Sequence, residues 1–159
     1  MEKELSNSCT NTCAGLKPSS EMKLILQLSL AFLKMENQFL PLQASFAREF
    51  AQDWVGAWNS HDLERILNHY DDEAVLTSPF ALRLLNGDGT VRGKAALREY
   101  FVRGLQTFPD LHFELIDVLW GIETIVVYYL NSVRGSKTAE VMLLSPGGKI
   151  SRVWANYNL

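Results

Sequence analysis

Glu140, His112 and Asn131 are the residues of this 159-residue sequence whose types and expected positions best fit acid–base chemistry. A carboxyl group buried among apolar side chains tends to keep its proton, and a neighbouring imidazole exchanges a proton near neutral pH. Glu140 and His112 could therefore move a proton on and off a bound carbon acid, with Asn131 as an orienting group. The alternative is structural: Glu140 only bonds to Asn131 or to a water, and His112 lies at a solvated rim.

Four strands are expected to position these residues. After Pro109 the apolar period changes from 3.6 to 2, and the runs 111–120, 124–133, 137–145 and 149–157 are rich in Val, Ile and aromatic residues. The connections between them are short, which requires antiparallel hairpins. Turns at 134–137 and 146–149 predict these opposed pairs: Asn131 with Glu140, Tyr129 with Met142, Met142 with Val153, and Glu140 with Ala155.

One face of this sheet is expected to line a small-molecule pocket. A turn centred on Gly121 and Ile122 adds the even-numbered residues of the first strand to the face that carries Glu140. The face then shows His112, Glu114, Ile116, Val127, Tyr129, Asn131, Thr138, Glu140, Met142, Val153 and Tyr157. A mostly apolar concave wall with a few polar groups is typical of ligand pockets, so we expect a small apolar organic ligand.

The opposite face is just as apolar in this register. It shows Leu111, Phe113, Leu115, Val126, Tyr128, Leu130, Val141, Leu143 and Trp154. A sheet with two hydrophobic faces needs a cover on each, and the helices supply only one. The sequence therefore predicts a homodimer that packs through the outer sheet face.

Three helices are expected to cover the inner face. Phe46, Phe50, Trp54 and Trp58 recur at helical spacing, and Asn59-Ser60-His61 ends that helix, with Ser60 as the expected N-cap of the next. A short helix with Leu63, Ile66, Leu67 and Tyr70 on its buried side is followed by a brief strand over 74–78 that stops at Pro79, and Gly93 opens a third helix. This order predicts an α+β fold with three helices packed on a curved, mostly antiparallel sheet.

Four segments in this order resemble the nuclear transport factor 2-like superfamily, in particular its SnoaL-like branch. They are WVGAWNSHDLERILNHYDDEAVLTSP, VRGKAALREYF, FPDLHFELIDV and GGKISRVWANY, and the match covers roughly residues 46–157. The resemblance implies a cone-shaped α+β barrel around a deep pocket that the first helix closes. Trp54, Trp58, Ser78 and Tyr100 would then join the sheet residues at the pocket wall.

The resemblance leaves the activity open, because the superfamily includes ketosteroid isomerase, polyketide cyclases, limonene epoxide hydrolase, dehydratases and non-catalytic binding modules. Aligned with ketosteroid isomerase, the sequence has Ser78 in place of the general base and Trp54 in place of a tyrosine, which disfavours steroid-type isomerisation. Three functions remain open: a binding protein with an apolar pocket, a cofactor-independent lyase, isomerase or cyclase that uses Glu140 and His112, and an association module without turnover.

Residues 1–44 are expected to be a leader or tail, partly disordered or forming an appended helix, and 45–159 the SnoaL-like domain. A weak secretory signal around 22–33 and a translation start at Met22 or Met35 are the alternatives. Cys9 and Cys13 are the only cysteines, too few for a zinc site, and no metal or cofactor is expected. The Lys and Arg residues form no basic stripe, so we expect no nucleic acid. The apolar run at 22–33 is too short to span a bilayer and the body has no cysteine, so we expect no membrane and a cytoplasmic location.

Overall fold

The computed structural model describes residues 19–38, 42–85, 87–133 and 135–158 and divides the chain into two units, Met1–Gln38 and Phe39–Leu159. In the first unit, helix α1 spans Ser20–Gln38. Cys9 and Cys13 lie outside the described residues. Among the helices that the structure describes, none is long and apolar enough to cross a membrane.

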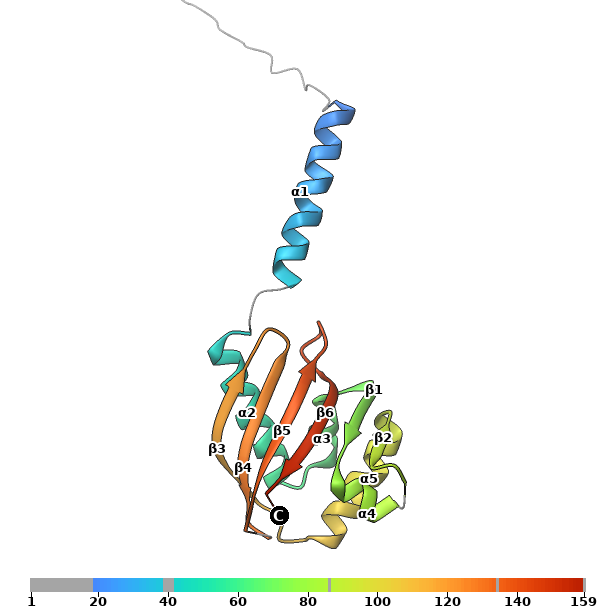
Figure 1. Ribbon diagram of the computed structural model, residues 1–159, viewed down its shortest axis with the longest axis vertical. Helices are drawn as coiled ribbons and strands as arrows, with labels where there is room; N and C mark the ends of the chain where they lie inside the picture. The colour runs from blue at the N-terminus through green and yellow to red at the C-terminus, as the bar shows by residue number, and fades with distance from the viewer. Residues whose placement is uncertain (1–18, 39–41, 86, 134, 159) are drawn as a thin grey trace, which may run out of the picture. The chain divides into compact units, whose positions relative to one another are not determined.

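The second unit is built on a six-stranded sheet in the order β2-β1-β6-β5-β4-β3 (Figure 1). Its strands are β1 (Tyr70–Thr77), β2 (Thr90–Arg92), β3 (Phe113–Trp120), β4 (Thr124–Asn131), β5 (Ser136–Leu144) and β6 (Ile150–Tyr157). All neighbours are antiparallel except β1 and β6, which are parallel. The sheet is curved but does not close, since β2 and β3 remain its two edges. The predicted α+β class and mostly antiparallel sheet are confirmed.

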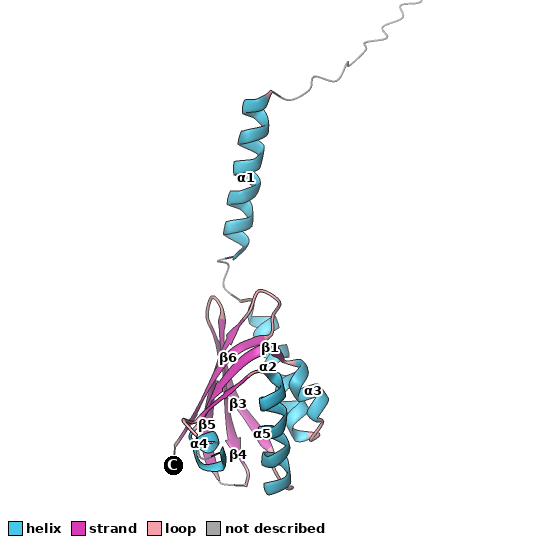
Figure 2. Cartoon of the chain, turned by 90° about the vertical axis from the view of Figure 1, so that its right-hand side faces the viewer, coloured by secondary structure: helices cyan, strands magenta, loops and turns pink. Residues whose placement is uncertain are grey.

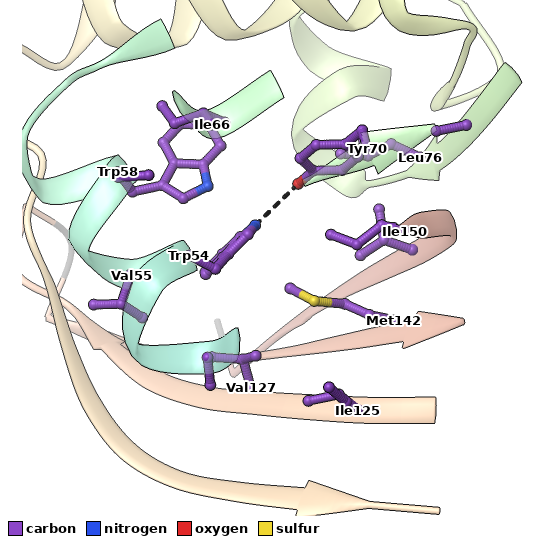
Figure 3. Packing of buried hydrophobic residues seen from close by; sticks show 14 of the residues in the cluster. Trp54, Val55, Trp58, Ile66, Tyr70, Leu76, Ile125, Val127, Met142 and Ile150 are labelled. Atoms are coloured by element: carbon purple, nitrogen blue, oxygen red, sulfur yellow. Dashed lines mark hydrogen bonds between the residues drawn. The ribbon is translucent and has the colours of Figure 1, made fainter. Parts of the chain in front are cut away.

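Helices cover one face of this sheet, where α2 (Ala44–Asn59), α3 (Leu63–Asn68) and α5 (Lys94–Thr107) lie together (Figure 2). The buried side of α2 presents Ala47, Ala51, Trp54, Val55, Ala57 and Trp58. The spacing of these residues is that of a helix with one wide apolar stripe, as the sequence predicts. The alanines leave room for the large tryptophans on the same stripe. Figure 3 shows the rings of Trp54 and Trp58 in the core.

Strand β3 corrects the predicted register. The hairpin turns at 121–124, where the Gly121 amide donates to the Thr124 carbonyl, so Val118 faces inward opposite Val127. A bulge between Leu115 and Asp117 then inserts one extra residue, and beyond it Phe113 pairs with Asn131. A shift of one residue exchanges the two faces of a strand. Phe113 is therefore buried, whereas His112 and Glu114, which we expected inside, are exposed.

The pairing register of the β4–β5 hairpin differs from the predicted register by four residues. Asn131 pairs with Ser136, Tyr129 with Thr138 and Glu140 with Val127, so the expected pairs Asn131–Glu140 and Tyr129–Met142 are wrong. Strand β4 ends at Asn131 and β5 begins at Ser136, so the predicted turn at 134–137 is displaced. Four is an even number, so every side chain keeps its predicted face. The β5–β6 pairs Glu140–Ala155 and Met142–Val153 are confirmed.

Two elements between β1 and α5 were not expected. Helix α4 spans Pro79–Leu85 and β2 follows it. Pro79 does not simply end the preceding strand: it is the first residue of α4, where a missing N–H costs nothing. The expected cap is also wrong, because Ser60 ends α2, and the Asp62 carboxylate caps α3 by accepting from the Arg65 amide over 3.0 Å.

The outer sheet face is apolar over its central strands. Val126, Tyr128, Val141 and Leu143 are half-buried there, and Leu119 and Trp154 are exposed. Leu111, Phe113 and Leu115, which the predicted register placed on this face, instead contact the core. Within the described residues of this unit, α2, α3 and α5 cover the other face of the sheet, and no helix covers this one (Figure 2).

Candidate functional site

A cavity of about 90 Å³ lies between the inner face of the sheet and the helices α2, α4 and α5. A cavity of about 10–15 Å³ is enough for one water, so this one has room for a small organic group. Its wall is dominated by aromatic and aliphatic side chains. The lining residues are Trp54, Trp58, Tyr70, Leu76, Ser78, Phe80, Leu84, Tyr100, Phe101, Gly104, Phe108, Leu111, Phe113, Tyr129, Asn131, Val133, Glu140, Ala155 and Tyr157.

Most of the residues that the sequence singles out do meet at this cavity. The sheet contributes Tyr129, Asn131, Glu140 and Tyr157, and Ser78 follows β1; the helices contribute Trp54, Trp58 and Tyr100. Met142 and Val153 face the same way, but they pack in the solid core beside the cavity with no exposed surface. Periodicity assigns a residue to a face of a strand, but it does not say how far along the strand the cavity extends.

His112 does not join this group. It precedes β3, its side chain is exposed, and its carbonyl accepts hydrogen bonds from the amide and hydroxyl of Ser132. The inward position belongs to Phe113, whose ring stacks on Trp54 at 5.9 Å between centroids. The predicted Glu140–His112 pair is therefore wrong, because the bulge in β3 exchanges the two faces of the strand.

Glu140 is the one carboxyl group among the described residues that line the cavity. Glu140 is 7% exposed, and the Tyr129 phenol donates a hydrogen bond to its Oε1 atom over 3.2 Å. Burial raises the pKa of Glu140 to about 7, although the bond from Tyr129 acts in the opposite direction. A carboxyl with this pKa can both donate and accept a proton near neutral pH, which is the requirement for a general acid or base.

The tyrosines around Glu140 are held in their neutral form. Burial raises the pKa of Tyr129 well above its usual value, and the nearby Glu140 carboxylate raises it further. The pKa of Tyr100 rises to about 12, again mainly through burial. Because neutral phenols can donate hydrogen bonds, these residues can orient a polar group of a ligand without adding charge to the cavity.

The fold around the cavity matches known proteins. A family model described as the SnoaL-like domain matches residues 51–153. A SnoaL-like protein of unknown function from Burkholderia thailandensis is 33% identical, with a TM-score of 0.73 over 76% of this chain and 100% of that chain. The chain belongs to the SnoaL-like family.

More distant structures share the fold of this SnoaL-like domain. A protein of unknown function with a cystatin-like fold from Methylobium petroleophilum has a TM-score of 0.59 at 14% identity, covering 76% of this chain and 80% of its own. TerC, co-crystallised with polyporic acid, has a TM-score of 0.58 at 17% identity, covering 71% of this chain and 92% of its own. A search of curated proteins found no match.

Two positions separate this SnoaL-like domain from the ketosteroid isomerase pattern. Ser78, at the expected position of the base, is 2% exposed, accepts from the Phe80 amide over 3.1 Å and shares a hydrogen bond with the Tyr157 hydroxyl at 3.2 Å. The Trp54 indole N–H donates to the Tyr70 hydroxyl over 3.3 Å (Figure 3). A serine without a partner base cannot abstract a proton from carbon, so Glu140 is the candidate acid–base group.

Several lining residues of the SnoaL-like domain escaped the sequence reasoning. Phe80 and Leu84 belong to α4, and Phe108 follows α5; the Phe80 ring meets Phe108 edge-on at 6.1 Å. The proline that begins α4 was the available signal for this helix. In the part of the chain that the structure describes, no group of three His, Cys, Asp or Glu side chains could hold a metal ion.

Proposed function

We propose that this SnoaL-like domain binds a small, largely apolar organic molecule in its cavity. The observation that carries the proposal is the position of Glu140: a buried carboxyl at the wall of an aromatic cavity, hydrogen-bonded to Tyr129. An apolar wall supplies affinity through burial, and a few fixed polar groups supply orientation. Open space beside these groups favours binding over an association module whose interior is filled by its own side chains.

The fold is compatible with such a ligand. TerC shares it and was co-crystallised with polyporic acid. At 17% identity this likeness shows the fold alone, and it supports the ability of this architecture to take up an organic molecule.

Proton transfer is the second candidate function, and the pKa of Glu140, about 7, favours it. With His112 outside the cavity, Glu140 would act as both acid and base, in an isomerase, lyase or cyclase that needs no cofactor. Tyr129 would keep its proton and orient the carboxyl group. Binding is the common requirement of both candidates. For an isomerase, Glu140 would take a proton from one carbon of the ligand and return it to another, which leaves the carboxyl group unchanged after each turnover.

Mass spectrometry of the native protein tests binding directly. We expect the purified full chain to release a small apolar molecule on denaturation, and that molecule, added back, to raise the melting temperature. If it is recovered unchanged, the protein is a binding module; if it is converted and Glu140→Gln stops the conversion while sparing binding, the protein is an enzyme. Native protein that neither retains such molecules nor gains stability from them contradicts the proposal.

We further propose that two copies pack through the outer sheet face. The half-buried Val126, Tyr128, Val141 and Leu143 form a continuous apolar surface with Leu119 and Trp154 at its margins. Contiguous exposed apolar patches are uncommon on monomers because the contact of apolar surface with water is unfavourable. A second copy of the same face would bury this surface symmetrically.

A cytoplasmic location is also proposed. The sequence after Cys13 contains no cysteine, so the domain does not depend on disulfides that an oxidising compartment would form. Fractionation of cells that produce the full chain tests this location: we expect the protein in the cytosolic fraction, and recovery from the secreted or membrane fraction would contradict it.

A further inference from the structure

Within the part of the chain that the structure describes, the indole N–H of Trp58 has no hydrogen-bond acceptor. Trp58 lines the cavity, and only 9% of the residue is exposed. Buried N–H groups are nearly always paired, since leaving one unpaired forfeits its hydrogen bond to water. Trp54, one turn earlier on the same helix, has a partner in the Tyr70 hydroxyl. The missing acceptor is therefore a property of the position of Trp58 and not of tryptophans in α2 generally.

Neighbouring rings restrain Trp58 in this orientation. Phe101 packs edge-on against its ring at 4.9 Å, and Phe113 and Trp54 lie at 5.7 and 5.9 Å. Figure 3 shows the nitrogen-bearing edge of the ring turned toward Tyr70, which is another lining residue. In a close-packed aromatic cluster the ring cannot rotate to find a protein acceptor without opening a void. The Trp58 N–H is thus held at the cavity wall without an acceptor among the described residues.

The charges around the cavity restrict which acceptor group a ligand can present to the Trp58 N–H. Among the described lining residues there is no Lys, Arg or His, and Glu140 is the one carboxyl group. An anionic ligand would thus be desolvated beside Glu140 without a counter-charge, which is strongly unfavourable. An uncharged oxygen meets the Trp58 N–H without that cost.

On the basis of the proposed function, we propose that the ligand carries a neutral oxygen acceptor, such as a ketone, and that the Trp58 indole N–H anchors it. The apolar remainder of the ligand packs among the aromatic side chains. The role of Trp58 is binding, independent of whether Glu140 turns the ligand over.

Three probes with one carbon skeleton test this inference on the full chain by titration calorimetry: 1-indanone, which carries a ketone, indane, which has no acceptor, and 2-aminoindane, which is a cation. A net hydrogen bond predicts that wild-type protein binds 1-indanone about three- to tenfold more tightly than indane. In Trp58→Phe an aromatic ring remains but the N–H donor is lost, so 1-indanone and indane should bind with about equal affinity. Trp120→Phe, an exposed tryptophan that does not line the cavity, is the matched control and should keep the preference.

A second readout is independent of affinity. In nitrogen–proton spectra, 1-indanone should move the Trp58 indole signal, identified by its loss in Trp58→Phe, toward lower field, and indane should not. Equal affinities for 1-indanone and indane, tighter binding of 2-aminoindane, or an unchanged preference in Trp58→Phe would each overturn the inference while leaving binding in place. If none of the three probes binds, this inference and the proposed function fail together.

Discussion

The Tyr129 hydroxyl donates to Glu140 Oε1 across the β4–β5 pair, although the two residues are not directly opposed in the sheet. Tyr129 lies opposite Thr138, and Glu140 lies opposite Val127. The contact is thus diagonal, which long side chains on the same face can span. It fixes the carboxyl group on a rigid hairpin instead of on a loop, and this is the arrangement that a binding or acid–base group requires.

Stability should fall as the pH rises from about 4.5 to about 7, because of Glu140. Its pKa is about 7 in the folded protein, against 4.5 for the free side chain, so the folded state binds more protons between these values. The stability that the protonated Glu140 contributes is fully present below pH 4.5 and is lost as the pH rises through 7. The pKa difference corresponds to about 3 kcal/mol of unfolding free energy. Urea unfolding across this range checks it.

Glu140→Gln is the control for that experiment, since the amide oxygen can still accept from Tyr129 and no longer titrates. The variant should lose less stability than the wild type over the same pH range, by about 3 kcal/mol. Parallel pH profiles for the two proteins would show that Glu140 is not a buried titrating group.

Tyr129→Phe should raise the pKa of Glu140 further. The hydrogen bond from Tyr129 lowers this pKa, so removing the donor leaves burial unopposed. We also expect a loss of about 1 kcal/mol of unfolding free energy for the missing bond. The side-chain carboxyl signal of Glu140 in carbon NMR, followed against pH, reports the midpoint. Tyr128→Phe, on the outer face of the same strand, is the matched control and should leave it in place; a lower midpoint in Tyr129→Phe would contradict the assigned contact.

Gly104 should limit the size of the ligand. It lines the cavity from α5, and a Cβ added there would meet no atom within 4 Å. Gly104→Ala should stabilise the helix by about 0.5–1 kcal/mol, because glycine is the costlier residue in a helix. Gly104→Leu should fill the cavity and weaken 1-indanone binding at least about tenfold, or ~1.4 kcal/mol. Gln106→Leu, exposed on the same helix, is the control; unchanged affinity in Gly104→Leu would place the ligand elsewhere.

The outer sheet face should hold a dimer together. Sedimentation of the wild-type chain at micromolar concentration should give a dimer, and Leu143→Lys should give a folded monomer, because a charge cannot be buried there without a partner. Gln52→Lys, exposed on α2, tests whether an added positive charge alone has this effect and should leave the dimer intact. A wild-type monomer would rule out this role for the face.

The inner faces of β4 and β5 could be predicted from sequence because both strands alternate strictly between buried and less buried residues. Tyr129, Asn131 and Glu140 follow from that alternation even where the predicted turn was displaced, since the error was even. The face of His112 could not be predicted. The extra residue at the β3 bulge has no distinctive sequence signal, and its single-residue shift replaces His112 by Phe113 at the cavity.

Helix α4, which contributes to the cavity wall, was equally hard to predict. Pro79 is compatible with a strand end and with the first turn of a helix, and only the packing of Phe80 against Phe108 and Tyr157 distinguishes the two in the folded chain. The unpaired N–H of Trp58 also depends on packing. Trp54 and Trp58 lie four residues apart on the same buried face of α2, so their positions in the sequence do not distinguish them.

A crystal structure of the full chain soaked with 1-indanone tests the central claim most directly, namely that a sheltered cavity beside Glu140 admits an organic molecule. We predict electron density for the probe between Trp58, Tyr129 and Glu140, with the protein backbone unchanged. An interior filled by its own side chains, or a Glu140 side chain directed into solvent, would contradict the account.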